Sequence, residues 1–380
     1  MDRKPPTNWS RRGFIGAAAA AGLVVAGCGR EPRPAGVAAA APPHRTPTPT
    51  PAPRGPYQPG ILEPAQAQLQ FAAFDVDRDD PADLRELLVR WTATAGAAMA
   101  ATPGLTITFG FGASLFRRFG LQDARPDALA PLPAFRSDDL EAGRSGGDLC
   151  AQICADDAPA AWNALHALGR DAAGIARPRW IQSGFGRPPG STETPRNTLG
   201  FKDGSRNLDV HDPAMLAEHV WSAGNPEWMR DGTYLVARRI RTLLDVWDAT
   251  TVAHQEASIG RHRDTGAPLG KRGEHDDPDF NAMPPDSHVR LAAPEANGGA
   301  RLLRRGFNYS DGVDPHTGQI DAGLFFICFQ RDPQRQFVRI QQRLDRADAL
   351  NRHLVHTGSA VFACPAAARP RGFVGETLLS

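Results

Sequence analysis

The order of strand and helix patterns along the chain constrains its fold more than any other feature of the sequence. Residues 68–76 alternate apolar and polar side chains like a strand, and Asp80-Pro81-Ala82-Asp83 then begins a helix that runs to about Ala100. The first half continues with strands expected at 105–112, 148–154 and around Trp180, and with a helix at 158–169. The second half predicts strands at 233–241, 302–306 and 323–330, and helices at 243–260 and 334–344.

These two runs of strands and helices predict an α+β protein made of two ferredoxin-like domains. Each domain would be an antiparallel sheet with peripheral helices on one face. We place the N-terminal domain at residues 61–215 and the C-terminal domain at residues 216–380. No sequence repeat relates the two halves, so the duplication is a prediction about shape alone.

The N-terminus predicts export rather than a folded element. Residues 10–16 read Ser-Arg-Arg-Gly-Phe-Ile-Gly, and the apolar run that follows, from Ala17 to Gly27, is too short to span a bilayer comfortably. Paired arginines before Phe-Ile mark the twin-arginine route, which carries proteins that are already folded. We therefore assign residues 1–28 to a signal peptide and expect a periplasmic or cell-envelope protein whose cofactor is loaded before export.

The end of this signal peptide has two interpretations. Val25-Ala26-Gly27-Cys28 resembles a lipoprotein processing box, in which case a lipid on Cys28 anchors the mature chain. The alternative is ordinary cleavage nearby, with Cys28 discarded. Residues 29–60 are rich in Ala, Pro and Thr and have little apolar bulk to bury, so we expect a disordered linker there.

Charge and cysteine content exclude two classes of protein. A net charge of +1 gives no field that favours nucleic acid, and no nucleic-acid partner is expected. Five cysteines without a Cys-x-x-Cys are too few for a disulfide scaffold. Cys150 and Cys154 lie on the same side of a predicted strand and could pair, but we favour two buried, small apolar side chains.

Three segments of the chain carry residues suited to chemistry. They are Gly200-Phe201-Lys202-Asp203-Gly204, Ser287-His288-Val289-Arg290 and Leu303-Arg304-Arg305-Gly306. Taken singly, these segments are typical of a turn, a solvated loop histidine and a surface charge patch. Taken together and in this order, they point to a more specific interpretation.

Together the segments resemble the dye-decolourising peroxidase family, and most closely its twin-arginine-exported deferrochelatase/peroxidase branch. The resemblance extends from about Tyr57 to the C-terminus and includes the motifs Tyr57-Gln58-Pro59-Gly60-Ile61, Gly110-Phe111-Gly112-Ala113-Ser114 and Thr265-Gly266-Ala267-Pro268-Leu269-Gly270. It implies a dimeric α+β barrel type of fold, haem b as cofactor, and hydrogen peroxide and organic electron donors as substrates. It also implies a homodimer and a link to periplasmic iron-uptake components.

The resemblance also implies roles for individual residues. His288 would be the proximal ligand of the haem iron, Asp203 would lie on the distal side, and Arg304 would lie beside Asp203. Gly204, Arg290 and Arg304 would contact the cofactor. A carboxylate bonded to the other imidazole nitrogen would favour O–O cleavage, and we choose Asp332 as the candidate.

The chemistry of peroxide fits these roles. Cleavage needs a proton moved from the inner to the outer oxygen, and an ionised Asp203 could shuttle it. Arg304 would keep that carboxylate ionised and would stabilise the charge on the departing oxygen. An aspartate shuttle predicts a pH optimum on the acid side. The glycines around Asp203 would let the backbone bend close to the haem edge.

The chain departs from the family pattern at two places. Ala293 stands where the exported branch tends to have Asn, and Ser205-Arg206-Asn207 replaces the more usual Thr-Ala-Asn. Both changes could alter contacts to the haem propionates or access to the haem.

Other candidate residues have structural interpretations. We expect His353 and His356 at a solvated helix end. Trp247 and Tyr309 could relay electrons, but we favour packing roles for both. His262 and His275 lack a partner at metal-ligand spacing.

Three other functions stay open from the sequence. A deferrochelatase would release iron from haem and leave the porphyrin intact. A haem carrier or sensor would bind haem without turnover, and an Asp203→Ala substitution would leave it unaffected. A ferredoxin-like binding module without haem would purify as a colourless protein.

Overall fold

The computed structural model describes residues 55–315 and 317–380, so the predicted signal peptide and nearly all of the predicted linker lie outside the described residues. The first half contains β1 (Gln68–Val76), α1 (Pro81–Ala101), β2 (Thr106–Gly112), α2 (Ala113–Arg118), β3 (Leu149–Ala155), α3 (Ala158–Ala172) and β4 (Ala176–Phe185). The second half contains α4 (Pro213–His219), β5 (Thr233–Thr242), α5 (Leu244–Asp248), α6 (Val252–Ile259), α7 (His288–Ala292), β6 (Leu303–Arg304), β7 (Phe307–Val313), β8 (Ile320–Gln330), α8 (Arg339–Ala347) and β9 (Leu354–Cys364).

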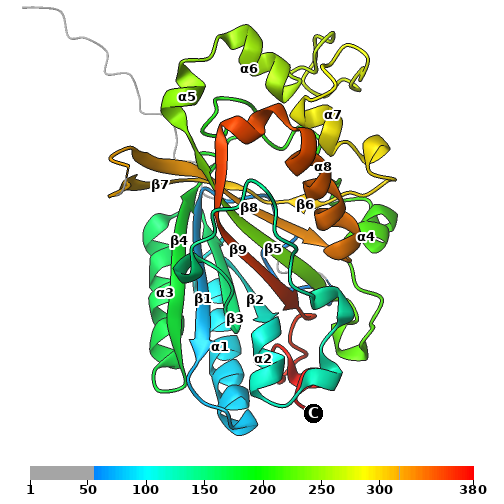
Figure 1. Cartoon of the computed structure of the whole chain (residues 1–380). Helices are drawn as coiled ribbons and strands as arrows, with labels where there is room; N and C mark the ends of the chain where they lie inside the picture. The colour runs from blue at the N-terminus through cyan, green and yellow to red at the C-terminus, as the bar shows by residue number, and fades with distance from the viewer. Residues whose placement is uncertain (1–54, 316) are drawn as a thin grey trace, which may run out of the picture. The chain divides into compact units, whose positions relative to one another are not determined.

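The strands form one antiparallel sheet that closes on itself. Their order is β5-β9-β2-β3-β1-β4-β7-β8-β6, and β8 also pairs with β5, which joins eight of the strands into a ring. Within the ring, β4-β1-β3-β2 and β9-β5-β8-β7 each have the strand order of a ferredoxin-like unit. Figure 1 shows the two units side by side. The predicted α+β fold built from two ferredoxin-like halves is therefore confirmed.

The halves are joined by side chains more than by backbone pairing. Between them, β2 and β9 share two residue pairs, and β4 and β7 share one. Inside the ring, Phe71 of β1 packs against Phe325 of β8 and Phe362 of β9, with ring centroids 5.3 and 6.1 Å apart. The interior is thus shared between the halves, and the boundary that we placed between residues 215 and 216 stays a prediction.

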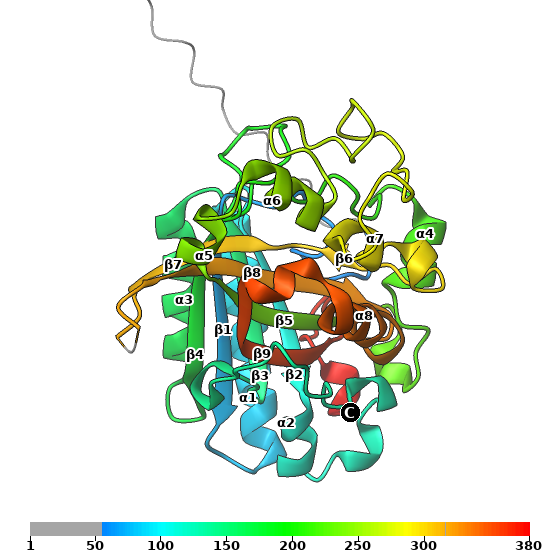
Figure 2. The same ribbon diagram turned by 45° about the horizontal axis from the view of Figure 1, so that its top comes forward.

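Helices cover the outer faces of the two units. α1 and α3 pack against each other and against the sheet of the first half, where Trp91 and Leu168 are buried. α7 and α8 pack together beside the strands of the second half (Figure 2). Among residues 55–315 and 317–380, no helix combines the length and apolar character needed to cross a membrane.

Local signals account for the elements that were predicted well. The Asp80 carboxylate accepts a hydrogen bond from the Ala82 N–H at 2.8 Å, and Pro81 occupies the first turn of α1. On β1, Leu69 and Phe71 face the ring interior while Phe74 belongs to the cluster under α1 and α3, as the alternation of a strand requires. The predicted helix at 243–260 is two helices, because Thr251 caps the start of α6.

One expectation about the C-terminal region is wrong. His353 and His356 do not lie at a solvated helix end, since they are 2% and 6% exposed. His356 belongs to β9, which pairs with β5 along its whole length. Tertiary pairing therefore decides the conformation of this segment, and neither β9 nor β7 was predicted.

The cysteines of the described residues are unpaired. Cys150, Cys154, Cys328 and Cys364 are free and fully buried, most of them in the ring interior. The interpretation of Cys150 and Cys154 as buried apolar side chains is confirmed. Cys28 lies outside the described residues.

Because Phe71 contacts both halves, its loss should destabilise the protein as a whole. We expect Phe71→Ala to lower the free energy of unfolding by about 3–5 kcal/mol, measured by urea denaturation followed by circular dichroism. Phe185→Ala is the matched control because Phe185 is 45% exposed, and its effect should stay within about 0.5 kcal/mol. A loss below about 1 kcal/mol for Phe71→Ala would contradict a shared core.

Candidate active site

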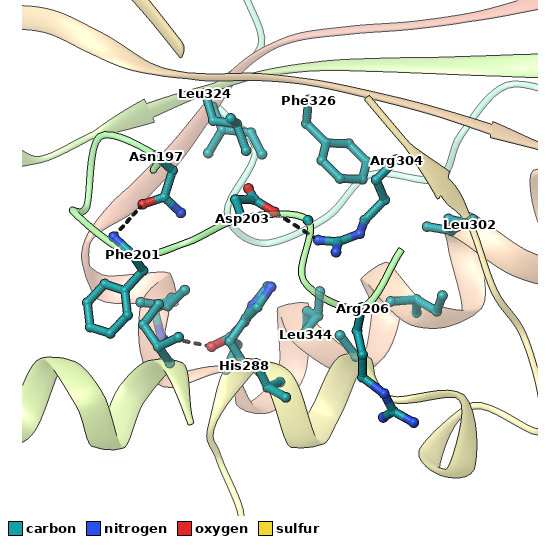
Figure 3. A pocket seen from close by; sticks show the side chains of 18 of the residues that line it. Asn197, Phe201, Asp203, Arg206, His288, Leu302, Arg304, Leu324, Phe326 and Leu344 are labelled. Atoms are coloured by element: carbon teal, nitrogen blue, oxygen red, sulfur yellow. Dashed lines mark hydrogen bonds and ion pairs between the residues drawn. The ribbon is translucent and has the colours of Figure 1, made fainter. Parts of the chain in front are cut away.

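A large cavity lies in the second half, between its sheet, the helices α7 and α8, and the loop at residues 197–208. Its walls are mostly apolar, and the charged groups gather at a few points. Figure 3 shows Leu324 and Phe326 of β8 on one side of this cavity and Leu344 of α8 on the other. The predicted residues Asp203, Gly204, His288 and Arg304 all line it.

His288 is the first residue of α7 and projects into the cavity. Its Nδ1 lies 2.6 Å from Oδ2 of Asp348, which follows α8 and is almost fully buried. The other oxygen of Asp348 accepts the backbone N–H of Leu350 at 2.9 Å, which fixes the carboxylate. Within the described residues, Nε2 of His288 has no hydrogen-bond partner.

The charge of Asp348 determines how His288 is protonated. Burial lowers the pKa of the imidazole, but the charge and hydrogen bond of Asp348 outweigh burial, so the pKa of His288 lies above its ordinary value. A proton is therefore held on Nδ1, between the ring and the carboxylate. In the neutral ring, which a metal ligand must be, Nε2 is then the nitrogen that can offer a lone pair to a ligand in the cavity.

The carboxylate behind His288 is Asp348, so the choice of Asp332 is wrong. Asp332 lies before the helical segment at 334–347, and its Oδ1 accepts the backbone N–H groups of Gln334 and Arg335. Asp348 lies at the opposite end of that segment, where the Ala349 N–H bonds to the Asp286 carbonyl at 3.0 Å and brings the chain back to α7. His288 and Asp348 are 60 residues apart, and no sequence signal indicates that the chain returns to α7 after α8.

Asp203 and Arg304 form an ion pair across the cavity from His288. Oδ1 of Asp203 lies 3.0 Å from Nη1 of Arg304, and both side chains are about one third exposed. Figure 3 shows this pair and His288 entering the cavity from opposite sides. Gly204 has a φ of +118°, a conformation that favours glycine and lets the loop turn directly after Asp203.

A side-chain clamp holds Arg304 in place. The amide of Asn207 accepts the Arg304 backbone N–H at 2.9 Å and donates to the Arg304 carbonyl at 2.8 Å. Arg304 also pairs with Cys328 of β8 through β6. The loop that carries Asp203 and the strand that carries Arg304 are therefore fastened to each other.

The remaining predicted residue, Arg290, is not brought to the cavity wall. Its Nη1 donates to the Met283 carbonyl at 2.9 Å, and it is absent from the residues that line the cavity. The two departures from the family pattern do reach the cavity, because Ser205, Arg206 and Ala293 line it. Trp247 and Tyr309 are fully buried in apolar clusters, as expected for packing roles, and an electron relay through either residue stays a hypothesis.

Sequence reasoning missed a buried polar group at the base of the cavity. Arg238 of β5 and His356 of β9 line it, and Nη2 of Arg238 lies 2.5 Å from Nδ1 of His356 and also pairs with Asp138. Burial and the charge of Arg238 lower the pKa of His356 to about 3. Only the pairing of β5 with β9 brings these residues together, so no local pattern could have identified them.

The residues present fit a haem group. An iron porphyrin needs an imidazole with an available nitrogen, apolar walls for the ring and cations for the propionates. Nε2 of His288 meets the first need, and Leu324, Phe326 and Leu344 contribute to the second. Arg206 and Arg301 line the cavity as well, and their guanidinium groups supply the kind of cation that propionates need.

Comparison with known proteins identifies the family. Residues 58–186 match the family model described as "Dyp-type peroxidase, N-terminal", and residues 194–369 match the one described as "Dyp-type peroxidase, C-terminal". The chain belongs to the Dyp-type peroxidase family. The resemblance seen in the sequence is thereby confirmed, together with haem as the cofactor and peroxidase as the enzyme class.

Individual relatives are similar over most of their length. A dye-decolorizing peroxidase of Thermobifida fusca is 38% identical over a 420-residue alignment that covers 97% of each chain. A deferrochelatase of Escherichia coli K12 is 35% identical over 367 residues, 86% of each chain. A Dyp-type peroxidase structure from Streptomyces coelicolor is 42% identical with a TM-score of 0.82, covering 86% of this chain and 96% of that one. An oxyferrous complex of DtpA from Streptomyces lividans gives the same identity and coverages with a TM-score of 0.83.

The low pKa of His356 predicts a loss of stability in acid. Between pH 6.5 and about 3, the unfolded chain binds a proton at His356 that the native Dyp-type fold does not bind, so stability falls as the pH falls. We expect His356→Gln to reduce the slope of unfolding free energy against pH by up to about 1.4 kcal/mol per pH unit. Urea titrations from pH 7 to pH 4 measure this slope. His275→Gln, at an exposed histidine, should leave it unchanged, and an unchanged slope in His356→Gln would refute the assignment.

Proposed function

We propose that this Dyp-type peroxidase reduces hydrogen peroxide at a haem held by His288 and oxidises organic donors, with Asp203 as proton shuttle. The observation that carries the proposal is the opposed arrangement of two polar pairs. His288 and Asp348 approach the cavity from one side, and Asp203 and Arg304 approach it from the other. Such a cavity would offer a ligand for the iron on one side and acid–base chemistry on the other.

The first pair would set the ligand. Nε2 of His288 would hold the iron, while Asp348 keeps the proton on Nδ1 and increases the electron density of the ring. When bound, haem supplies the iron centre at which peroxide is reduced by two electrons, which the donors then replace. Overall, one peroxide, two protons and two donor electrons give two waters.

The second pair, Asp203 and Arg304, would transfer the peroxide proton and stabilise the negative charge that develops on the departing oxygen. A carboxylate oxygen of Asp203 takes the proton from one peroxide oxygen and returns it to the other oxygen, which leaves as water. The guanidinium of Arg304, 3.0 Å from Asp203, stabilises negative charge on the departing oxygen. It also keeps Asp203 aimed into the cavity, because the Asn207 amide fixes the backbone of Arg304.

The ligand role of His288 predicts a spectroscopic change. The purified protein should show an intense haem absorption band near the blue edge of the visible spectrum, and His288→Ala should lose it, because the substitution removes the imidazole nitrogen that would hold the iron. Haem titration followed by absorbance measures the loss. His262→Ala is a suitable control, since His262 pairs with Glu256 outside the cavity. Retention of the native spectrum by His288→Ala would contradict the assignment.

The shuttle role of Asp203 predicts a kinetic change without loss of haem. We expect Asp203→Ala to lower kcat/KM for peroxide by about 10²–10⁴-fold, the usual contribution of a positioned general acid–base group. Stopped-flow kinetics with a matched absorbance spectrum would separate turnover from haem content. A variant with normal turnover would instead support a different proton shuttle, and a wild type without turnover would support a haem carrier.

A second candidate function is removal of iron from haem. The 35% identity to a deferrochelatase over 86% of the chain favours keeping it. Its product would be metal-free porphyrin with an intact ring, which fluoresces, whereas peroxidase turnover produces none. Incubation of the protein with haem under reducing conditions distinguishes the two.

Export and assembly complete the proposal. The arginine pair at positions 11 and 12 and the apolar run after it support export by the twin-arginine route, and the sequence before Cys28 supports a lipid anchor. The mass of the mature N-terminus decides between lipidation and ordinary cleavage. The homodimer and the contacts with iron-uptake components stay predictions from the family resemblance.

A further inference from the structure

The carboxylate of Glu274, which lies outside the cavity, contacts one residue on each side of Asp203. Oε2 of Glu274 lies 2.5 Å from Nζ of Lys202, and Oε1 accepts a hydrogen bond from the Ser205 hydroxyl at 3.0 Å. Lys202 precedes Asp203, and Ser205 follows Gly204. The two oxygens of Glu274 therefore hold the short loop segment on either side of the residue assigned as proton shuttle.

The segment that carries Glu274 is itself fixed. The buried Arg261 donates through Nη1 to the carbonyls of Gly266 and Glu274, at 2.6 and 2.9 Å. The stem of Lys202 lies against Gly266, where a Cβ would come within 2.7 Å of Lys202 Cδ. Gly266 also has a φ of +75°, a conformation that favours glycine, and this backbone conformation together with the close approach explains the glycine in the Thr-Gly-Ala-Pro-Leu-Gly motif, to which the proposed chemistry gives no role.

The ion pair is sheltered from water. The Glu274 side chain is 13% exposed and that of Lys202 is 20% exposed, so the pair is screened less than a surface pair. Burial would raise the pKa of Glu274, but hydrogen bonds from Lys202, Thr194 and Ser205 lower it to about 2. Glu274 therefore stays charged at neutral and mildly acidic pH.

Asp203 needs this support because its own carboxylate has few anchors. Among the described residues, its one hydrogen bond partner is Arg304. Its backbone N–H bonds to the Pro195 carbonyl at 2.8 Å, and the following Gly204 adds freedom rather than restraint. A loop of this kind holds a catalytic group in place only when a neighbouring element restrains it.

We propose that Glu274 is a positioning residue for Asp203, acting as a clasp that fixes residues 202–205 and keeps the Lys202 ammonium engaged away from the Asp203 carboxylate. The inference rests on the proposed role of Asp203 and adds the group that holds it. A neutral residue at 274 would release Ser205 and leave an uncompensated ammonium one residue from the shuttle. Small displacements of a catalytic group cost up to about 100-fold in rate.

Hydrogen exchange of the haem-loaded protein tests the clasp without reference to turnover. In Glu274→Gln, the amides of residues 200–207 should exchange at least about tenfold faster, while those of α7 should be unchanged. Asp276→Asn is the matched control, because Asp276 bonds to the Gly273 backbone in the same segment and does not contact residues 202–205. Unchanged exchange in Glu274→Gln would overturn the clasp.

A kinetic cycle then tests whether the clasp acts through Asp203. Glu274→Gln should lower kcat/KM for peroxide by about 10–100-fold, with KM for the organic donor unchanged. In an Asp203→Asn background the same substitution should change the rate by less than about threefold. Equal losses in both backgrounds would overturn the proposal and indicate general destabilisation.

The two hypotheses fail in different ways. Normal turnover in Asp203→Asn alone would remove the proposed shuttle, whereas slow exchange in Glu274→Gln would remove the clasp. Should Glu274→Gln not fold, Ser205→Ala removes one of the two contacts between Glu274 and residues 202–205 and keeps the charge of Glu274. That variant should exchange about threefold faster at residues 203–207, and wild-type exchange there would count against the clasp.

Discussion

Strand β8 is the element on which both the core and the cavity depend. It pairs with β5 on one side and with β7 and β6 on the other, so it closes the ring of strands. Phe325, Ile327 and Phe329 point to the shared interior, and the alternate residues Leu324 and Phe326 line the cavity. A shift of one residue would exchange these two faces. The register that packs the protein therefore also builds the wall of the active site.

Two aspartates serve the cavity under different physical conditions. Asp348 is almost fully buried, and its neighbour is an imidazole that holds a proton between them. Asp203 is partly exposed beside a guanidinium, where a proton can arrive and leave. In the proposed function, the two carboxyl groups would thus take separate tasks from their surroundings, as in other enzymes that use paired carboxyl groups. Residues outside the cavity hold each aspartate in place. The turn after α8 holds Asp348, and Glu274 and Asn207 hold the loop that carries Asp203.

Much of this arrangement could be predicted from the sequence, and the remainder depends on tertiary contacts. The alternation of residues 68–76 and the Asp-Pro start of α1 are local signals, and they gave the right elements. His288, Asp203 and Arg304 were found because they lie in motifs that resemble a family. Asp348, His356 and Glu274 lie in no such motif. They reach the site through the turn after α8, the pairing of β5 with β9, and the packing of residues 261–276 on the loop at residues 202–205.

The buried cysteines have a consequence for an enzyme that consumes an oxidant. Peroxide attacks thiolates, and the four described cysteines lie in the interior, where burial raises the pKa of each thiol. They therefore remain protonated and out of contact with solvent. Sulfur in these positions fills space in the buried core without offering a target for sulfenic acid formation. The fold thus limits the oxidation of these cysteines by the enzyme's own substrate, peroxide, during turnover.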